Sequence, residues 1–258
     1  MIGLGLSNTK NEDERFVFHP KDISLCNFFL HSYTKNLVVE TGEEGVTTWK
    51  DECLTNTEGP FDFEQTTTNL QPQYSAANET ITFNEDFFSA KSDSGVLDTV
   101  APGNLGWSFV WAGAFDSFTR RQAIFGEAST DETFFQMTGT DANFQLKAKE
   151  PGGTATTTIF LTPSLADIGF VSGGDFNGVP IMIILTCDES GNVEMHFNNV
   201  TGSGASIGTK DVKIEILGSS NGDAFFRGNM NVVGAWKKQL NIGERTEVYN
   251  WFVSTILQ

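Results

Sequence analysis

The chain has 258 residues, of which 39% are hydrophobic and 19% are charged, so it is large and apolar enough to bury a core of its own. Its 16 basic and 33 acidic residues leave a net charge of −17 at pH 7. This charge argues against a nucleic-acid partner and against an anionic lipid surface, because both are bound through basic faces. No apolar run approaches the roughly 18 residues of a membrane span, so we expect no membrane partner.

The first residues differ in composition from the rest of the chain. An apolar stretch, Met1–Leu6, precedes a polar stretch of mixed charge. It lacks a basic flank and is too short for a secretory signal, which predicts synthesis in the cytoplasm. We expect residues 1–15 to form an N-terminal arm that is ordered only where a partner holds it, with Leu4 and Leu6 as candidate interface residues. Residues 16–258 then form one domain.

The three cysteines, Cys26, Cys53 and Cys187, are odd in number and widely spaced. Their spacing matches neither a zinc cluster nor a disulfide framework. We therefore expect three reduced thiols in apolar surroundings.

The domain has the pattern of many short strands separated by turns. Along Trp107–Phe115, aromatic residues recur at even offsets and would share one face of a strand. The segments Phe134–Met137 and Phe144–Lys147 would form a consecutive pair of strands. The continuous apolar run Ile181–Thr186 is typical of a strand buried on both faces. This pattern predicts an all-β fold, a sandwich of two antiparallel sheets or a barrel. The aromatic residues that would share a face are Trp107, Phe109, Trp111 and Phe115.

A hairpin is predicted around the turn cluster Asp188–Asn192. The strand after it, Val193–Phe197, alternates apolar and polar residues, which places His196 on the polar face as a solvated histidine. Asp188 and Asn192 also resemble the start of a calcium loop, although the twelve-residue spacing of an EF-hand is absent. A plain hairpin turn explains the same residues, since Asp, Ser, Gly and Asn all favour turns. A second alternating segment, Val212–Ile216, predicts another strand.

One helix is predicted, at the end of the chain. Asn241 can cap it, and Glu244 lies three residues later, as in a capping box. Apolar residues then recur at helical spacing, so the helix should lie on the sandwich and cover part of its edge. The residues of this apolar face are Val248, Trp251, Phe252, Thr255 and Ile256.

No catalytic constellation is visible. His19, His31 and His196 do not occur in pairs at metal-ligand spacing, and neither a nucleophile elbow nor a phosphate loop occurs. Glycosidases with a sandwich fold place two acids at alternate positions of one strand, and no such run is present. We therefore expect a protein that is not an enzyme and has no cofactor, with calcium as the open alternative.

Two groups of aromatic residues are candidates for contact with a partner. In Phe87-Phe88 and in Phe225-Phe226, adjacent rings would point to opposite faces of an extended chain, so one ring of each pair would be available at an interface. The tryptophans could form a platform for sugars, or they could pack in the core. They are Trp49, Trp107, Trp111, Trp236 and Trp251.

Several segments together resemble a known family. The chain has a Phe-x-Pro entry, a Trp-x-Asp step, a Gln-Pro-x-Tyr step, a central hairpin, and a strand followed by a Glu-Arg cap and an amphipathic helix. These segments are Phe18–Ile23, Trp49–Asp51, Gln71–Tyr74, Ile184–Asn199 and Gly234–Phe252. In this order they resemble the concanavalin A-like, laminin-G-like jelly-roll domains of tailed-phage virion proteins.

The resemblance implies a jelly-roll sandwich with an N-terminal arm and one C-terminal helix. It also implies a non-enzymatic virion structural protein, made in the host cytoplasm, that acts as a capsid decoration or a tail-associated part. Its partners would be other virion proteins, and it would be multimeric in the particle. The alternative is a lectin-like module that recognises a host-surface glycan, and a glycoside hydrolase or lyase is a third possibility.

Overall fold

The computed structural model describes residues 18–32, 36–39, 45–53, 60–91, 105–116, 120–139, 143–163, 178–198, 200–202 and 204–256. The predicted arm, with Leu4 and Leu6, lies outside the described residues.

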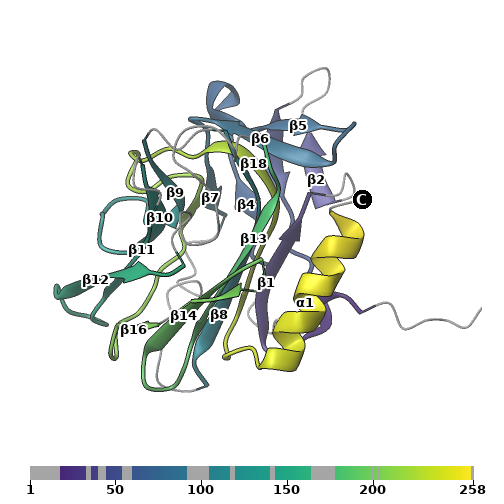
Figure 1. Ribbon diagram of the computed structural model, residues 1–258. Helices are drawn as coiled ribbons and strands as arrows, with labels where there is room; N and C mark the ends of the chain where they lie inside the picture. The colour runs from purple at the N-terminus through teal and green to yellow at the C-terminus, as the bar shows by residue number, and fades with distance from the viewer. Residues whose placement is uncertain are drawn as a thin grey trace, which may run out of the picture.

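The described residues form two antiparallel sheets that face each other, as Figure 1 shows, so the predicted all-β jelly-roll sandwich is confirmed. Sheet A contains β15 (Val200–Thr201), β14 (Asn192–Phe197), β13 (Ile181–Cys187), β8 (Trp107–Phe115), β18 (Arg227–Trp236), β6 (Thr80–Asn84) and β5 (Gln73–Ser75) in that order, with β1 (Cys26–His31) on β18 and β16 (Ala205–Ser206) on β14. Sheet B contains β12 (Thr156–Leu161), β11 (Phe144–Lys149), β10 (Phe134–Thr138), β9 (Arg121–Gly126), β17 (Ile216–Leu217), β7 (Phe88–Ala90), β4 (Phe63–Glu64), β3 (Val46–Trp49) and β2 (Leu37–Val39). Two 3₁₀ turns, η1 (Pro20–Asp22) and η3 (Thr68–Leu70), complete the strand-rich part of the chain.

The main core lies between the two sheets and is rich in aromatic rings. The predicted shared face of β8 is confirmed, because Trp107, Phe109, Trp111 and Phe115 all belong to this core and are almost fully buried. Every residue of β13 is buried, as the continuous apolar run predicts. The predicted pairing of β10 with β11 and the hairpin of β13 with β14 are also present.

The C-terminal helix, α1 (Ile242–Thr255), begins with the predicted capping box. The Asn241 side chain accepts a hydrogen bond from the Glu244 N–H at 3.1 Å, and the Glu244 carboxylate accepts one from the Asn241 N–H at 3.0 Å. Val248, Trp251 and Phe252 are buried, as expected. The helix does not cover an edge, however. It packs on the outer face of sheet A (Figure 1), where it forms a second core with residues of β1, β8, β13 and β18.

The predicted strand Val212–Ile216 is mostly wrong, since only Ile216 belongs to β17. Val212 and Ile214 do point into the main core, so their alternation reflects burial. The Thr133 hydroxyl takes the place of a neighbouring strand: it donates to the Lys213 carbonyl at 2.9 Å and accepts from the Lys213 N–H at 3.1 Å.

The prediction of three reduced thiols is wrong for two of them. Cys26 in β1 and Cys53 form a disulfide, while Cys187 is a buried thiol in the main core. The pairing depends on the contact between β1 and the chain after β3, which a separation of 27 residues does not indicate.

None of the described helices is long and apolar enough to cross a membrane.

Candidate binding cavity beneath the C-terminal helix

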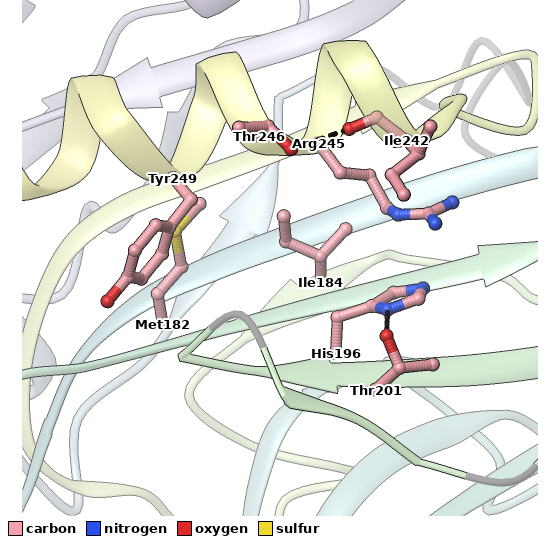
Figure 2. A pocket seen from close by; sticks show the side chains of 8 residues that line it. All are labelled: Met182, Ile184, His196, Thr201, Ile242, Arg245, Thr246 and Tyr249. Atoms are coloured by element: carbon pink, nitrogen blue, oxygen red, sulfur yellow. Dashed lines mark hydrogen bonds between the residues drawn. The ribbon is translucent and has the colours of Figure 1, made fainter.

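A cavity of about 270 Å³ lies on the outer face of sheet A, where α1 meets the β13–β14 hairpin (Figure 2). Its volume is close to the lower end of the range for small-molecule sites. The residues that line it are Met182, Ile184, His196, Thr201, Ile242, Arg245, Thr246 and Tyr249.

The floor of the cavity is apolar. Met182 and Ile184 point outward from β13 because side chains alternate along a strand, and both belong to the second core beneath α1. The other wall comes from α1. Its four lining residues are spaced three and four apart, so they share one side of the helix: Ile242, Arg245, Thr246 and Tyr249.

His196 contributes a neutral imidazole. The prediction that it is solvated is wrong, because α1 covers this face of the sheet and leaves the side chain only 6% exposed. Its ring nitrogens lie 3.3 Å from the Thr186 hydroxyl and 3.0 Å from the Thr201 hydroxyl. Burial, and then the positive charge of Arg245, lower the pKa of His196 to about 4.

Arg245 supplies a positive charge at the cavity. Figure 2 shows its side chain reaching from α1 toward the His196 ring. The guanidinium is oriented by one hydrogen bond, from Nη1 to the Leu240 carbonyl at 2.8 Å. Within the described parts of the chain, no carboxylate forms an ion pair with it. In a protein with a net charge of −17, this is an unusual arrangement for an arginine.

The lining therefore combines an apolar floor, a phenol ring, two hydroxyl groups, a neutral imidazole and one cation. None of the described residues that line the cavity has a carboxylate, although the Glu194 carboxylate lies 3.6 Å from His196 Nε2. These groups can bind and orient a small polar molecule that carries a negative charge, but they include no pair of acids for glycoside hydrolysis.

The predicted calcium residues, Asp188 and Asn192, hold a turn. One Asp188 carboxylate oxygen accepts the N–H groups of Ser190 at 2.8 Å and Asn192 at 2.9 Å, and the other accepts the Asn192 side-chain amide at 2.9 Å. These hydrogen bonds lower the pKa of Asp188, the one from the Asn192 side chain most. Gly191 has a φ of 78°, which completes the turn. The hairpin-turn interpretation explains every one of these contacts.

The paired phenylalanines divide between the core and the surface. Phe88 and Phe226 are fully buried, so they are not available to a partner and are wrong as interface candidates. Phe87 and Phe225 are half-buried, and their ring centroids lie 6.4 Å apart, so the remaining rings of the two pairs pack on each other.

The tryptophans form no sugar platform. All five are buried, with Trp251 the most exposed at 7%. Trp251 belongs to the second core, beneath α1. Aromatic stacking on a ligand at the cavity therefore depends on Tyr249.

The structure also unites residues that the sequence spacing separates. His19, His31 and Glu52 come together beside the disulfide, with one potential ligand atom from each within 4.8 Å of the others. The linear spacing of the histidines does not indicate this cluster, because its members come from separate elements. Sequence reasoning also missed the cavity, although the i, i+3, i+4, i+7 spacing of its α1 residues was a usable signal.

No protein-family model and no curated protein sequence matches the chain. Solved structures do resemble it. The binding domain of Paraclostridial Mosquitocidal Protein 1 aligns with a TM-score of 0.60 and 13% identity, over 91% of this chain and 53% of that one. The binding domain of botulinum neurotoxin serotype D/C aligns with a TM-score of 0.56 and 8% identity, over 90% and 53% of the two chains.

A third structure is of botulinum neurotoxin type C, whose cell entry depends on interaction with two ganglioside molecules. It aligns with a TM-score of 0.55 and 7% identity, over 88% of this chain and 51% of that chain. The chain thus spans about half the length of these structures. At such identities the likeness shows the fold alone: this chain and these binding domains share a β-sandwich architecture.

Proposed function

We propose that this protein is a non-enzymatic binding module that recognises a glycan bearing a carboxylate, in the cavity beneath α1. The observation that carries the proposal is Arg245, a cation at a cavity with no carboxylate partner among the described residues. A guanidinium binds carboxylates through two parallel hydrogen bonds and is weakly hydrated, so it suits a half-buried site.

The remaining lining groups fit a sugar. Tyr249 offers a ring for stacking, and Thr201 and Thr246 offer hydroxyl groups at the exposed rim. His196 is neutral at pH 7, since its pKa is about 4, and it adds no second charge. Recognition would thus rest on one charged contact, one ring and several neutral polar contacts.

The structural comparisons support a binding role, and one of them concerns an acidic glycolipid ligand. The two aligned domains named above are binding domains, and the neurotoxin type C structure concerns ganglioside interaction. A ganglioside carries an acidic sugar, so its chemistry matches a site built around an arginine.

The proposal is tested by calorimetric titration with sialyllactose and with lactose, which differ in the acidic sugar. We expect saturable binding of sialyllactose and at least tenfold weaker binding of lactose. Arg245→Gln should weaken sialyllactose binding by about tenfold to a hundredfold, because a charge-assisted hydrogen bond contributes about 1.5–3 kcal/mol. Arg121→Gln removes an arginine of β9, in sheet B, that is paired with Asp223 at 2.6 Å and does not line the cavity, so it should leave binding unchanged.

Equal binding of the two sugars, or wild-type affinity in Arg245→Gln, would contradict the proposal.

A hydrolytic role has less support. Two other cavities, at the far side of α1 and at the β5–β6 turn, have one carboxylate each on their walls, Glu247 and Glu79. Neither therefore offers the two acids that glycoside hydrolysis needs.

A structural role in a tailed-phage virion is the second proposal, and it rests on the sequence resemblance. The half-buried ring pair Phe87 and Phe225 is one described feature that would serve contact with another virion protein. Quantitative mass spectrometry of purified particles tests it. About one copy per capsid subunit would indicate a shell decoration, a few copies per particle a tail part, and absence would exclude the virion role.

A further inference from the structure

Three potential metal ligands from distant parts of the sequence meet at the edge of the second core. His19 caps η1, His31 is the last residue of β1, and Glu52 follows β3. Their ligand atoms all lie within 4.8 Å of one another. His31 is fully buried and Glu52 is 7% exposed, so the group is built into the fold and is not a chance cluster on the surface.

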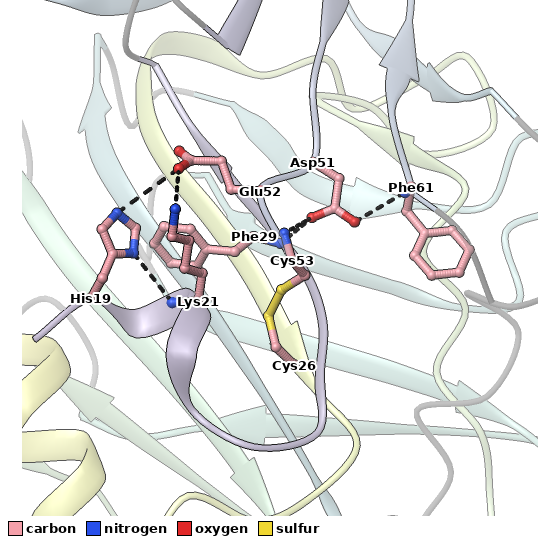
Figure 3. The surroundings of a disulfide bond; sticks show 8 residues. All are labelled: His19, Lys21, Cys26, Phe29, Asp51, Glu52, Cys53 and Phe61. Carbon is pink, nitrogen blue, oxygen red and sulfur yellow. Dashed lines mark hydrogen bonds and ion pairs between the residues drawn. A yellow bond between two sulfur atoms is a disulfide. The ribbon is translucent and has the colours of Figure 1, made fainter. Parts of the chain in front are cut away.

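The backbone around Glu52 is firmly held. Its N–H donates to the Phe29 carbonyl at 2.8 Å, and the next residue is tied to β1 by the Cys26–Cys53 disulfide. On the other side, the Asp51 carboxylate accepts three backbone N–H groups at 2.9–3.0 Å, those of Phe29, Cys53 and Phe61 (Figure 3). A metal ligand in this position would lose little conformational freedom on binding.

Aromatic contacts fix the two imidazoles. The His19 ring centroid lies 5.4 Å from that of Phe29 and 5.3 Å from that of Trp251. The His31 ring lies 5.1 Å from Trp251. Trp251 belongs to α1, so the helix forms one wall of the group. The aromatic rings lower the local dielectric constant, which strengthens charge interactions at the cluster.

Lys21 now balances the charge of Glu52. Its ammonium lies 3.3 Å from Glu52 Oε2, while the Asn36 amide donates to Oε1. Figure 3 shows Lys21 and His19 reaching Glu52 from the same side. The Lys21 side chain is 25% exposed and flexible, so it can turn out to solvent when another cation takes its place.

We infer that His19, His31 and Glu52 form a site for a divalent transition-metal ion, with zinc as the best fit, which displaces Lys21. Two imidazoles and one carboxylate are ligands of zinc, whereas calcium and magnesium prefer oxygen ligands alone. Tetrahedral zinc places its donors about 3.3 Å apart, so the three atoms must move together by about 1.5 Å at most. The fourth position would hold water.

A bound ion would link three separate segments of the chain. It would join η1, β1 and the segment after β3 at the place where α1 packs, and its site is separate from the cavity that contains Arg245. The inference does not depend on the glycan proposal, because the two sites share no residue.

The test is titration of the oxidised full chain at pH 7 with Zn²⁺ by calorimetry and with Co²⁺ by visible absorption. We expect one equivalent of each metal to bind, with the intense visible bands of a four-coordinate Co²⁺ site, and Ca²⁺ to give no heat. Absence of saturable Zn²⁺ binding, or Ca²⁺ binding of similar strength, would overturn the inference.

Substitutions of His19, Glu52 and Lys21 test whether the ion binds at this cluster. His19→Gln changes a partly exposed ligand and should fold normally, as circular dichroism can verify. We expect His19→Gln and Glu52→Gln each to weaken Zn²⁺ binding by about tenfold or more. Even residues that only hydrogen-bond to a metal ligand contribute about 10–100-fold to metal affinity. Glu64→Gln is the matched control, because Glu64 also pairs with a lysine, Lys91, but is not part of the cluster with His19 and His31. Lys21→Met should tighten binding, since it removes the competing cation. Wild-type affinity in His19→Gln would overturn the assignment.

Discussion

His196 is a titratable residue whose state is set by its neighbours. Burial and Arg245 favour the neutral imidazole, while the Glu194 carboxylate, 3.6 Å from Nε2, favours the charged one. Burial prevails because Glu194 is 44% exposed and its charge is screened by water. The imidazole therefore stays neutral down to a pH of about 4 in the folded chain.

The stability of the fold should depend on His196 between pH 6.5 and pH 4. The unfolded chain binds a proton at His196 below about pH 6.5 and the folded chain does so only near pH 4, so the free energy of unfolding falls as the pH falls through this window. The difference corresponds to about 3 kcal/mol. Urea denaturation at several pH values checks it. His196→Asn cannot titrate and should lose this part of the slope; an unchanged slope would contradict the assignment.

At the scale of single elements, the Cys26–Cys53 disulfide ties β1 to the segment after β3. It closes a loop with a sequence separation of 27, for which loop entropy predicts a stabilisation of about 3–4 kcal/mol. Reduction should lower the free energy of unfolding of the wild-type chain by that amount, which urea denaturation detects as a lower midpoint.

The double variant Cys26→Ser/Cys53→Ser is the control for reduction, because reductant should leave its midpoint unchanged. Cys187 does not complicate the measurement: burial, and then the charge of Asp188, raise the pKa of its thiol to about 12, so it is not a thiolate at neutral pH. If reductant leaves the urea midpoint of the wild-type chain unchanged, the disulfide contributes nothing to stability.

The capping box of α1 should contribute measurably to stability, because the helix covers the outer face of sheet A. Asn241→Ala removes the acceptor for the Glu244 N–H and should cost about 1 kcal/mol in the free energy of unfolding. Asn250→Ala lies on the exposed side of the same helix and should change it little. Equal losses in the two variants, measured by chemical denaturation, would contradict a specific role for the cap.

At the scale of the whole molecule, the net charge of −17 opposes the approach of an anionic glycan, whereas Arg245 favours its final contact. The two effects differ in range. The Debye length is about 30 Å at 0.01 M salt and about 10 Å at 0.1 M, so added salt screens the distant charges most.

The association rate of sialyllactose should therefore rise between 0.01 M and 0.1 M salt, and that of a neutral sugar should not change. Stopped-flow measurement of the Tyr249 environment, or of bound ligand, checks this prediction. A rate that falls with salt would show that a local positive field, and not the net charge, governs the approach.

The sequence by itself determined the strands that face the main core and the start of the helix. Alternation along Trp107–Phe115 and the apolar run in β13 depend on local periodicity, and so does the capping box at Asn241. These predictions hold in the folded protein because each depends only on residues that are close together in the sequence.

Only the tertiary structure decided where α1 packs, and several properties followed from that. The helix covered the polar side of β14, which buried His196 and created the cavity with Arg245. The contact of β1 with the segment after β3 paired Cys26 with Cys53 and brought His19 and His31 to Glu52. Each of these sites joins residues far apart in the chain, and their proximity comes from sheet pairing and helix packing, which local periodicity does not encode.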